Sequence, residues 1–431
     1  MSAERRYVVP DPIAGTIELP TWLVKIKDEP AIRRMSFIRQ LGLKAYVDYP
    51  GAIHTRYSHS LGTMYLASKL TDLLIQKMND RGKRILADNL NTNRSNIMAA
   101  GFLHDIAHGP FSHSVDFALK KITGKTHQDL AEDVVKNHLP PDLDNWVNRD
   151  QLVKIIRGIH DYPFISEIID GPIDVDKLDY LLRDAYHVGL RYSFDLDHFL
   201  RSHTILGDEE NLRTCKLGLE NNQQSIVVTE LFLVVWKSMY DIVYHIRDSR
   251  IAEKMLEKAI LINKDNESIR KLFTDINYFL DLDDEKLLSS LSNAGEISKN
   301  IVKSIRENKI FKVILEVDLN QEIFEMSPEF ITSLKDEDEV CDHISKIIND
   351  TYKQENYNYI CDIITSKSPK EIHINEKDEE TGDYVILRNK SSIVGAIQAL
   401  RRMLIYANPS LENIPEKESI FKSVKEIIEG L

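Results

Sequence analysis

Helical periodicity dominates the first 260 residues, and it constrains the fold more than any other feature of the chain. Asp28 can cap a helix whose apolar stripe continues at helical spacing until Gly42. Ser58 is expected to open a long helix, and residues 97–107 form another that a glycine-proline pair ends. A short extended piece separates the first two helices at residues 45–50. The same pattern predicts further helices near residues 128–138, 149–159, 164–170, 175–187 and 225–262.

The pattern changes at a polar joint near residues 264–266. Beyond this joint, residues 311–317 have the composition of a strand. Residues 371–374 and 383–387 flank a polar loop, as two strands would. Residues 391–406 carry an apolar stripe that predicts an amphipathic helix.

A chain of 431 residues is too long for one compact core, so two units are expected. Hydrophobic residues make up 42% and charged residues 29%, which is typical of a globular protein. We therefore predict a mostly α-helical fold with a helical core over residues 1–260. A smaller mixed α/β accessory region over residues 261–431 is expected to serve oligomerisation or regulation.

Composition excludes several classes of protein. No apolar run approaches the roughly 18 residues of a membrane span, and the N-terminal arginines lack the apolar segment of a secretory signal. Three widely spaced cysteines argue against a disulfide framework or a thiolate zinc site, and a reducing cytoplasm is the expected location. The net charge of −13 argues against stable binding of nucleic acid. Positive charge for an anionic ligand must therefore be concentrated in one pocket.

The segment FLHDIAHGPFSH, residues 102–113, brings three histidines and an aspartate to one helix end. His104 and His108 are four residues apart, so they are expected to share a helix face. A single buried histidine is more often a hydrogen-bonded core residue than a ligand. Burying four titratable groups without a metal or ligand would be costly, so this cluster favours a functional site. Twelve of the fourteen histidines precede residue 260, which places the chemistry in the first region.

Two further segments offer chemistry of the same kind. The expected helix at residues 175–187 has a polar face opposite its leucine-rich core stripe. That face is formed by Asp176, Tyr180, Arg183, Asp184 and His187. Alone, this pattern is equally well explained by a solvated helix face. His59 lies in the first turn of another helix, just after Arg56, where free backbone N–H groups attract anions.

Together these segments supply a mixed nitrogen and oxygen ligand set: His59, His104, Asp105 and Asp176. Such a set suits a divalent ion such as Mn, Fe, Mg or Zn, and calcium would prefer oxygen ligands alone. A metal held in this way lowers the pKa of bound water and polarises a phosphoryl oxygen. The leaving oxygen then needs a proton, and histidine is well matched to supply it near neutral pH. The candidates are His108, His113 and His127.

In their order and spacing, these motifs resemble the HD superfamily of phosphohydrolases, named for a pair such as His104-Asp105. More narrowly, they resemble the deoxynucleoside triphosphate triphosphohydrolases that carry SAM and HD domains. The similarity extends from about residue 8 to residue 260. It implies an enzyme that releases a nucleoside and intact triphosphate, and it also implies a homo-oligomer.

The resemblance assigns a role to each candidate residue. The metal ligands would be His59, His104, Asp105 and Asp176. The residues at the scissile phosphate would be His108, His113 and Asp116, with His127 as the general acid. The triphosphate would be held by Arg56, Lys177 and Tyr180. The sugar would lie against Gln40, Leu41 and Asp184, and the base near Tyr244 and Arg247.

The chain departs from the family pattern at Gln128, where the family has a glutamate that would raise the pKa of the neighbouring histidine. Two alternatives therefore stay open: hydrolysis of another nucleotide or phosphoester, and a nucleotide sensor with little turnover. A third alternative, a metallopeptidase, is suggested by the HDxxH spacing. It is disfavoured because that chemistry needs a glutamate and an uninterrupted helix.

Overall fold

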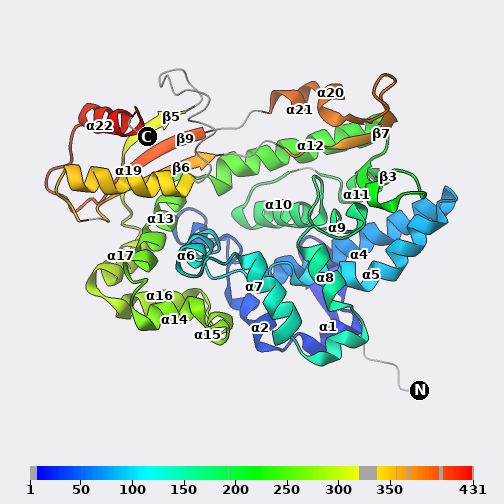
Figure 1. Cartoon of the computed structure of the whole chain (residues 1–431), viewed down its shortest axis with the longest axis horizontal. Helices are drawn as coiled ribbons and strands as arrows, with labels where there is room; N and C mark the ends of the chain where they lie inside the picture. The colour runs from blue at the N-terminus through cyan, green and yellow to red at the C-terminus, as the bar shows by residue number, and fades with distance from the viewer. Residues whose placement is uncertain are drawn as a thin grey trace.

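The computed structural model shows a helical body with a small three-stranded sheet at one end (Figure 1). It describes residues 7–192, 194–319, 337–355, 357–365, 369–397 and 401–429. The prediction of a mostly α-helical fold with a mixed α/β C-terminal region is confirmed. Among the described residues, no helix combines the length and the apolar character needed to cross a membrane.

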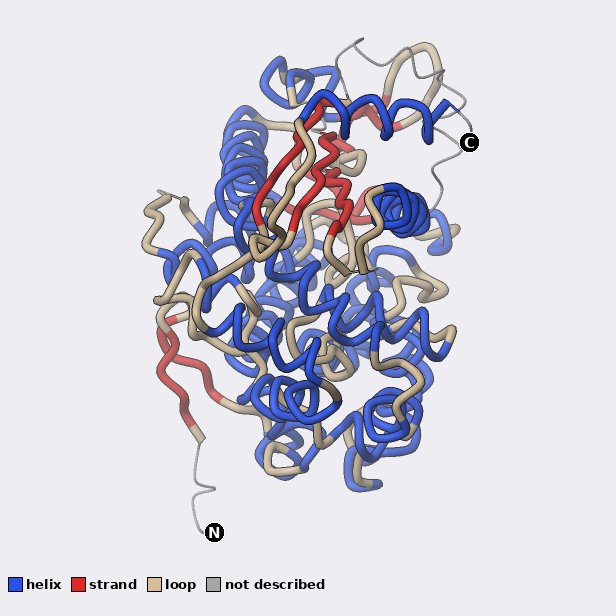
Figure 2. The backbone as a smooth tube through the Cα atoms, turned by 90° about the vertical axis from the view of Figure 1, so that its left-hand side faces the viewer, coloured by secondary structure: helices blue, strands red, loops and turns tan. Residues whose placement is uncertain are grey.

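The N-terminal part opens with an antiparallel hairpin, which lies at the end of the molecule opposite the C-terminal sheet (Figure 2). Its strands are β1 (Val8–Asp11) and β2 (Gly15–Glu18). The α-helices that follow are α1 (Thr21–Ile26), α2 (Pro30–Arg33), α3 (Lys44–Val47), α4 (Arg56–Asp80), α5 (Arg84–Leu103), α6 (His113–Thr123), α7 (His127–Asp133), α8 (Arg149–Ile156), α9 (Pro163–Ser166), α10 (Val175–Val188), α11 (Leu196–Ser202), α12 (Gln223–Met239) and α13 (Arg247–Ile262). Shorter elements between them are η1 (Arg34–Phe37), η2 (Val134–His138), η3 (Pro141–Asn145), β3 (His203–Leu206), η4 (Leu212–Thr214), β4 (Lys216–Leu219) and η5 (Tyr240–Tyr244).

Side-chain caps explain where the site-bearing helices begin. Helix α4 starts at Arg56, two residues before the predicted start, because Thr55 and Ser58 form a reciprocal capping box. Asp174 caps α10 as predicted, by accepting from the backbone N–H of Lys177. Helix α10 ends at Gly189, which takes the left-handed conformation that glycine tolerates.

Four helix and strand predictions in this part need correction. Residues 45–50 are not extended, since Lys44–Val47 forms α3 while the Lys44 side chain is buried against Glu253. The helix after Asp28 is instead the short α2 followed by η1, and it ends before Gly42 because Arg39 forms a β-bridge with Thr55. The predicted helix at residues 225–262 is two helices separated by the π-helical turn η5.

The fourth correction concerns the helix that carries the His-Asp pair. Helix α5 ends at Leu103, so His104 and His108 do not share a helix face. The buried Arg34 guanidinium donates to the carbonyl oxygens of Ile106 and His108, at 3.0 and 2.9 Å. These bonds satisfy backbone acceptors outside a helix, which allows the chain to turn here.

The C-terminal part adds helices and then the small sheet. Its helices are α14 (Glu267–Thr274), α15 (Ile276–Leu280), α16 (Asp284–Ala294), α17 (Glu296–Arg306), α19 (Glu337–Thr351), α20 (Leu387–Lys390), α21 (Ser392–Ala396) and α22 (Lys417–Glu429). Its strands are β5 (Lys312–Asp318), β6 (Tyr359–Thr365), β7 (His373–Lys377), β8 (Tyr384–Ile386) and β9 (Arg401–Ala407). The predicted strand at 311–317 is confirmed by β5. The predicted strand pair around a polar loop is confirmed by the antiparallel β7 and β8.

The amphipathic helix predicted over residues 391–406 is wrong. Only Ser392–Ala396 is helical there, and Arg401–Ala407 forms β9, the central strand of the sheet β5-β9-β6. Both neighbours run antiparallel to β9. Residues 403–407 are all buried, so their side chains have no polar alternation to distinguish a strand from a helix.

The main core continues past the predicted boundary. One cluster of buried side chains extends from the N-terminal helices through α14, α16 and α17, and a second, smaller cluster lies between the C-terminal sheet and its helices. Strands β7 and β8 also join β3 and β4 in one sheet, with β4 and β7 parallel. The two parts share extensive packing, so a domain boundary at residue 260 stays a prediction.

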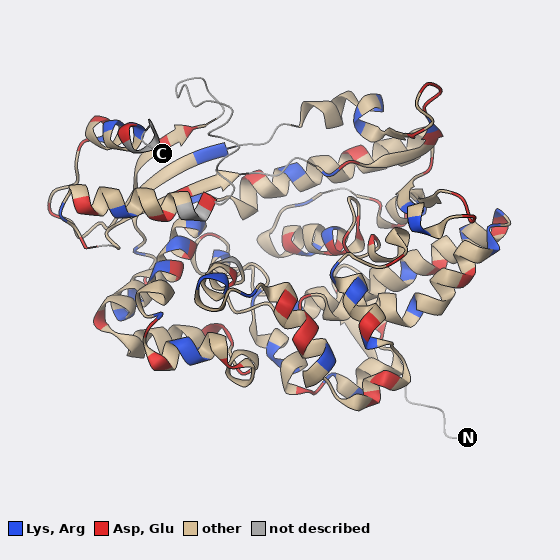
Figure 3. Cartoon of the chain, in the orientation of Figure 1, with Lys and Arg blue, Asp and Glu red and all other residues tan. Residues whose placement is uncertain are grey.

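Acidic and basic residues are interspersed over the face shown in Figure 3.

Candidate metal and phosphate site

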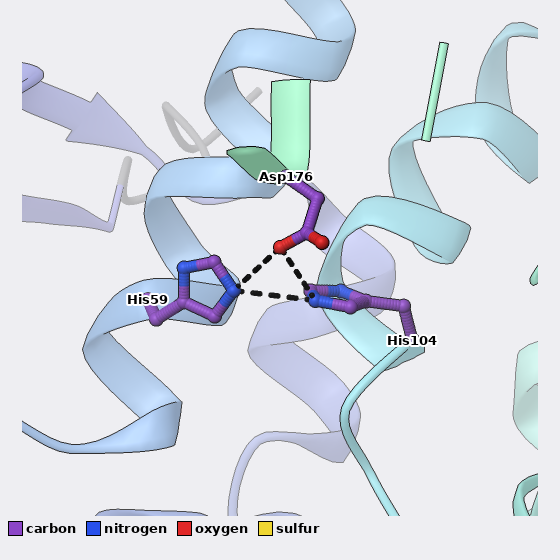
Figure 4. Close-up of side chains that lie close together, drawn as sticks. All are labelled: His59, His104 and Asp176. Atoms are coloured by element: carbon purple, nitrogen blue, oxygen red, sulfur yellow. Dashed lines mark hydrogen bonds and ion pairs between the residues drawn. The ribbon is translucent and has the colours of Figure 1, made fainter. Parts of the chain in front are cut away.

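Three of the four predicted metal ligands point at one another from three different segments (Figure 4). His59 Nε2, on α4, lies 2.9 Å from Asp176 Oδ1 on α10 and 3.3 Å from His104 Nε2. His104 Nε2 is also 3.3 Å from Asp176 Oδ1. The fourth residue, Asp105, places Oδ1 3.4 Å from His104 Nε2. The ligand atoms of His59, His104 and Asp176 lie close enough together to hold one cation, and Asp105 lies beside them.

The remaining ring nitrogens are held by acceptors. His59 Nδ1 lies 2.8 Å from Asp179 Oδ2, and His104 Nδ1 lies 3.0 Å from the carbonyl oxygen of Gly101. Asp179 is itself held by Arg183, which also pairs with Asp11 at 2.8 Å. Such outer partners place the hydrogen on Nδ1 and leave Nε2 for a metal. The donor set and its hydrogen bonds therefore fit a divalent cation.

The charges at this cluster are strongly coupled. Burial disfavours a charged His59, but the carboxylates of Asp176 and Asp179 outweigh it and raise its pKa to about 10. Burial also opposes the ionised form of Asp176, yet His104 and His59 hold its pKa well below the usual range. Without a metal, the carboxylates therefore favour protonated histidines. A divalent cation can replace these protons.

Arg56 connects the cluster to a strained turn. Its guanidinium donates to Asp105 Oδ2 and to Ser112 Oγ, and all three side chains are buried. Phe111 and Ser112 have φ angles of 57° and 35°, in the left-handed region that side chains rarely adopt. Strain of this kind persists where surrounding contacts impose it, and it is frequent at functional sites.

A second group of titratable side chains lies beside the first. His108 Nδ1 and His127 Nδ1 lie 3.2 and 3.4 Å from Asp116 Oδ2, and the two rings stack at 4.2 Å. His108 Nε2 is also 3.3 Å from Asp105 Oδ1, so His108 bridges the two groups. Burial and the nearby Arg56 lower the pKa of His108, while the histidines hold the pKa of Asp116 below its usual range against burial.

Both groups open into one cavity of about 920 Å³. On its α10 side, Asp184 accepts from Tyr244 Oη at 2.7 Å and lies 2.6 Å from His54 Nε2. Residues of the C-terminal part line another side, including Glu337 and Cys341. The candidate metal ligands, the histidine–carboxylate group and a polar wall of fixed hydrogen bonds therefore face the same space.

Comparison with known proteins identifies this arrangement. Residues 56–184 match the HD domain family, and residues 210–412 match the family described as the HD associated region. The chain belongs to the HD-domain superfamily. The predicted resemblance is confirmed, and the two matched ranges contain many of the residues that line the cavity.

Its relatives include proteins with and without a described activity. It is 32% identical over 310 residues to an uncharacterized protein of Methanocaldococcus jannaschii, covering 72% of this chain and 59% of that protein. It is 28% identical over 384 residues to the deoxynucleoside triphosphate triphosphohydrolase SAMHD1 of Homo sapiens, covering 76% and 59%. The crystal structure of a hypothetical protein from Aquifex aeolicus has the same fold, with a TM-score of 0.71 at 22% identity over 98% of this chain and 100% of that one.

The chain therefore spans about three fifths of the length of these two curated relatives. 

The HD cavity contains most of the residues expected at the substrate, but two lie outside it. The expected residues that line it are Gln40, Leu41, Arg56, Asp116, His108, His127, Tyr180, Asp184 and Tyr244. Lys177 does not line it, because its ammonium donates to Asp174 and to the carbonyl oxygen of Gly171. Arg247 is 58% exposed and faces Asp248 and Glu316. His113 begins α6, but its side chain lies outside the described part of the structure.

Several residues of the HD site were missed by reasoning from sequence. Asp179, His54 and Ser112 were not given a role, although each bonds directly to a predicted site residue. Arg183, expected on the polar face of its helix, is fully buried between Asp179 and Asp11. Only the Asp179 and Arg183 pair had a sequence signal, since their i,i+4 spacing on a helix favours an ion pair.

Proposed function

We propose that this HD protein is a metal-dependent phosphohydrolase that converts a deoxynucleoside triphosphate to a deoxynucleoside and triphosphate. The observation that carries the proposal is the single cavity shared by the metal cluster, the His108–Asp116–His127 group and the polar wall at Asp184. The substrate class is supported by the similarity to proteins described as deoxynucleoside triphosphate triphosphohydrolases.

The metal site has the chemistry that the reaction needs. A divalent cation held by His59, His104, Asp105 and Asp176 supplies a Lewis acid that lowers the pKa of bound water and polarises a phosphoryl oxygen. The two hydrogen bonds on the Nδ1 atoms orient the rings for this purpose. Arg56 donates to Asp105 Oδ2, and its charge, together with the nearby histidines, lowers the pKa of that carboxyl against burial.

The proton balance points to His127. Hydrolysis breaks the bond between the α-phosphorus and the 5′ oxygen, joins the water oxygen to phosphorus, and leaves one proton for the 5′ oxygen. His127 would donate that proton while Asp116, 3.4 Å away, stabilises its charged form. Gln128 contributes no charge where the family has a glutamate, and Asp116 supplies the carboxylate instead. The His108 ring stacked on His127 limits its rotation.

The polar wall suits a sugar. Asp184 holds two hydrogen bonds that fix its carboxylate, and Tyr180 packs edge-on against Tyr244 beside it. Gln40 Oε1 is buried and has no hydrogen-bond partner among the described residues, so it is available to a hydroxyl or amino group of a ligand. Leu41 is 6% exposed and would form the tight surface that favours a deoxy sugar.

The test is a product analysis. The purified protein would be incubated with each dNTP, each NTP and several monophosphates, with Mn or Mg, and the products separated by chromatography. We expect nucleoside and triphosphate from dNTPs, no turnover after metal chelation, and no turnover in a His104→Ala variant. His198→Ala, at an exposed histidine of α11, is the matched control and should retain activity.

The other outcomes separate the alternatives. Orthophosphate from monophosphates would keep the metal site and change the substrate. Nucleotide binding with no turnover of any compound would leave a nucleotide sensor. Assembly into a homo-oligomer is a separate prediction, which a mass measurement in solution would check.

A further inference from the structure

Two segments that lie in close contact form the wall of the cavity beside the candidate metal ligands. One is residues 40–42, and the other is the strained pair Phe111 and Ser112. They meet at Gly42, where an added Cβ would lie 3.3 Å from the Cα of Phe111. Because the turn at Phe111 is strained, contacts from elsewhere in the fold must hold it in place.

Asp284 supplies contacts to both segments from α16, far along the chain. Its side chain is buried, at 3% exposure, and Oδ2 accepts from the backbone N–H of Arg39 at 3.1 Å. The backbone N–H of Phe111 also favours the ionised form of this carboxylate, whose Oδ1 is buried with no hydrogen bond of ordinary geometry to a described residue. The carboxylate therefore lies between the residue that precedes one wall segment and the first residue of the other.

We propose that Asp284 is a positioning residue of the catalytic cavity, whose ionised carboxylate ties residue 39 to residue 111. The tie sets the place of Ser112, which accepts from Arg56, and Arg56 in turn holds the metal ligand Asp105. It also sets the place of Gln40, which follows Arg39 in the other segment of the same wall. This inference rests on the proposed function, because it assigns Asp284 to the same cavity.

Asp284 is expected to change its charge at a pH that is accessible to an activity assay. Burial raises its pKa to about 6, while the Arg39 amide, the Arg39 guanidinium and the Phe111 amide oppose that rise. The other charged or titratable groups that act on it are Asp283 beside it, Arg34 from η1 and Tyr46 from α3. Below pH 6 the carboxyl becomes neutral, its hydroxyl oxygen becomes a much weaker acceptor, and it loses the negative charge that strengthens its bonds to the two backbone N–H groups.

The first experiment compares Asp284→Asn with Asp281→Asn, a change at an exposed carboxylate three residues earlier. We expect kcat/KM of the unchanged protein to fall as pH drops through about 6. Asp284→Asn should have kcat about 10-fold lower at pH 7.5, with metal content unchanged and the break near pH 6 absent. Asp281→Asn should match the unchanged protein. A variant Asp284→Asn that keeps both the rate and the break would overturn the proposal.

The second experiment does not depend on turnover. Asp284→Ala removes the acceptor, so hydrogen exchange at the amide of Arg39 and in residues 109–113 should become at least about 10-fold faster. Exchange in the distant helix α12 should be unchanged, which would show that the variant is folded. Equal exchange in the unchanged and variant proteins would contradict the tie. If no nucleotide were hydrolysed by the unchanged protein, the proposed function would fail while this test still decided the role of Asp284.

Discussion

His59 has a role for each ring nitrogen. Nε2 faces the metal cluster, and Nδ1 is held by Asp179, which is in turn fixed by Arg183. The ring is 1% exposed, so its orientation depends on these partners and hardly at all on solvent. We therefore expect the metal affinity of this site to depend on Asp179, which is not itself a candidate ligand.

Asp179→Asn tests that dependence. The amide would keep the shape of the side chain but lose the negative charge that makes His59 a stronger ligand, so metal affinity should fall by roughly 10- to 100-fold. Titration of the metal-free protein with Mn or Zn in a calorimeter would measure it. Asp197→Asn, at an exposed carboxylate of α11, should leave the affinity unchanged. Equal affinities in the two variants would contradict the assigned role.

His245 predicts how stability changes with pH. Burial and the nearby Arg250 and Lys44 lower its pKa to about 4, below the ordinary value of 6.5. The folded state therefore holds His245 neutral, so its contribution to stability is present above pH 6.5 and is lost as pH falls toward 4. Urea unfolding between pH 4 and 7.5 should show a smaller acid-side loss in His245→Gln. His198→Gln, at an exposed histidine, should behave like the unchanged protein.

At the scale of elements, the close approach of α4 to α10 builds the site. Gly62 lies on α4 against the Asp179 and Arg183 side chains, and an added Cβ would collide with both. The helices can bring His59 and Asp176 within 2.9 Å because that position has no side chain. Glycine usually weakens a helix, so its presence here reflects packing.

Gly62→Ala should therefore disturb both stability and metal binding. Displacing the buried ion pair should cost about 1–3 kcal/mol in the free energy of unfolding, as overpacking of a core does. Metal affinity should fall as well, because Asp179 would move away from His59. Asn79→Ala, at the exposed end of the same helix, is the control and should change neither quantity. Denaturant unfolding and metal titration of both variants would check this, and a stable variant with normal affinity would oppose it.

At the scale of the whole molecule, one buried ion pair connects the helical body to the C-terminal sheet. Helix α13 lies between them (Figure 1). Its Arg250 donates to Asp362 of β6 at 2.7 Å, and Tyr406 of β9 donates to the same carboxylate at 3.0 Å. The cavity lies at this junction, since Arg250 and residues of β6 line it.

Asp362→Ala would leave the Arg250 charge with only Glu253 as a partner. We expect a loss of about 3 kcal/mol in the free energy of unfolding, as when one member of a buried pair is removed. Tyr406→Phe removes a single hydrogen bond and should cost about 1 kcal/mol. Denaturant unfolding of both variants would compare them, and equal losses would mean that the ion pair does not join the two parts.

Local patterns in the sequence determined much of this protein. The helical fold, the capped helix that carries Asp176, the strand at 311–317 and the four candidate metal ligands all depend on motifs a few residues long. Gln40, Asp184 and Tyr244 were expected near the substrate because their motifs resemble those of a known family. The cavity does contain these residues, while their roles stay predictions.

Only the tertiary structure decided the rest, because the deciding contacts join residues far apart in the chain. The periodicity predicted a helix that continues past Leu103. The chain turns there instead, and Arg34 donates to the carbonyl oxygens of Ile106 and His108. Residues 403–407 are buried on both faces in the central strand β9, although the apolar run had predicted a helix. Asp116 lies 3.4 Å from His127, a contact that the sequence did not predict. Periodicity and motifs report neighbours within a few residues, and a site assembled from α4, α10 and α16 requires the folded chain.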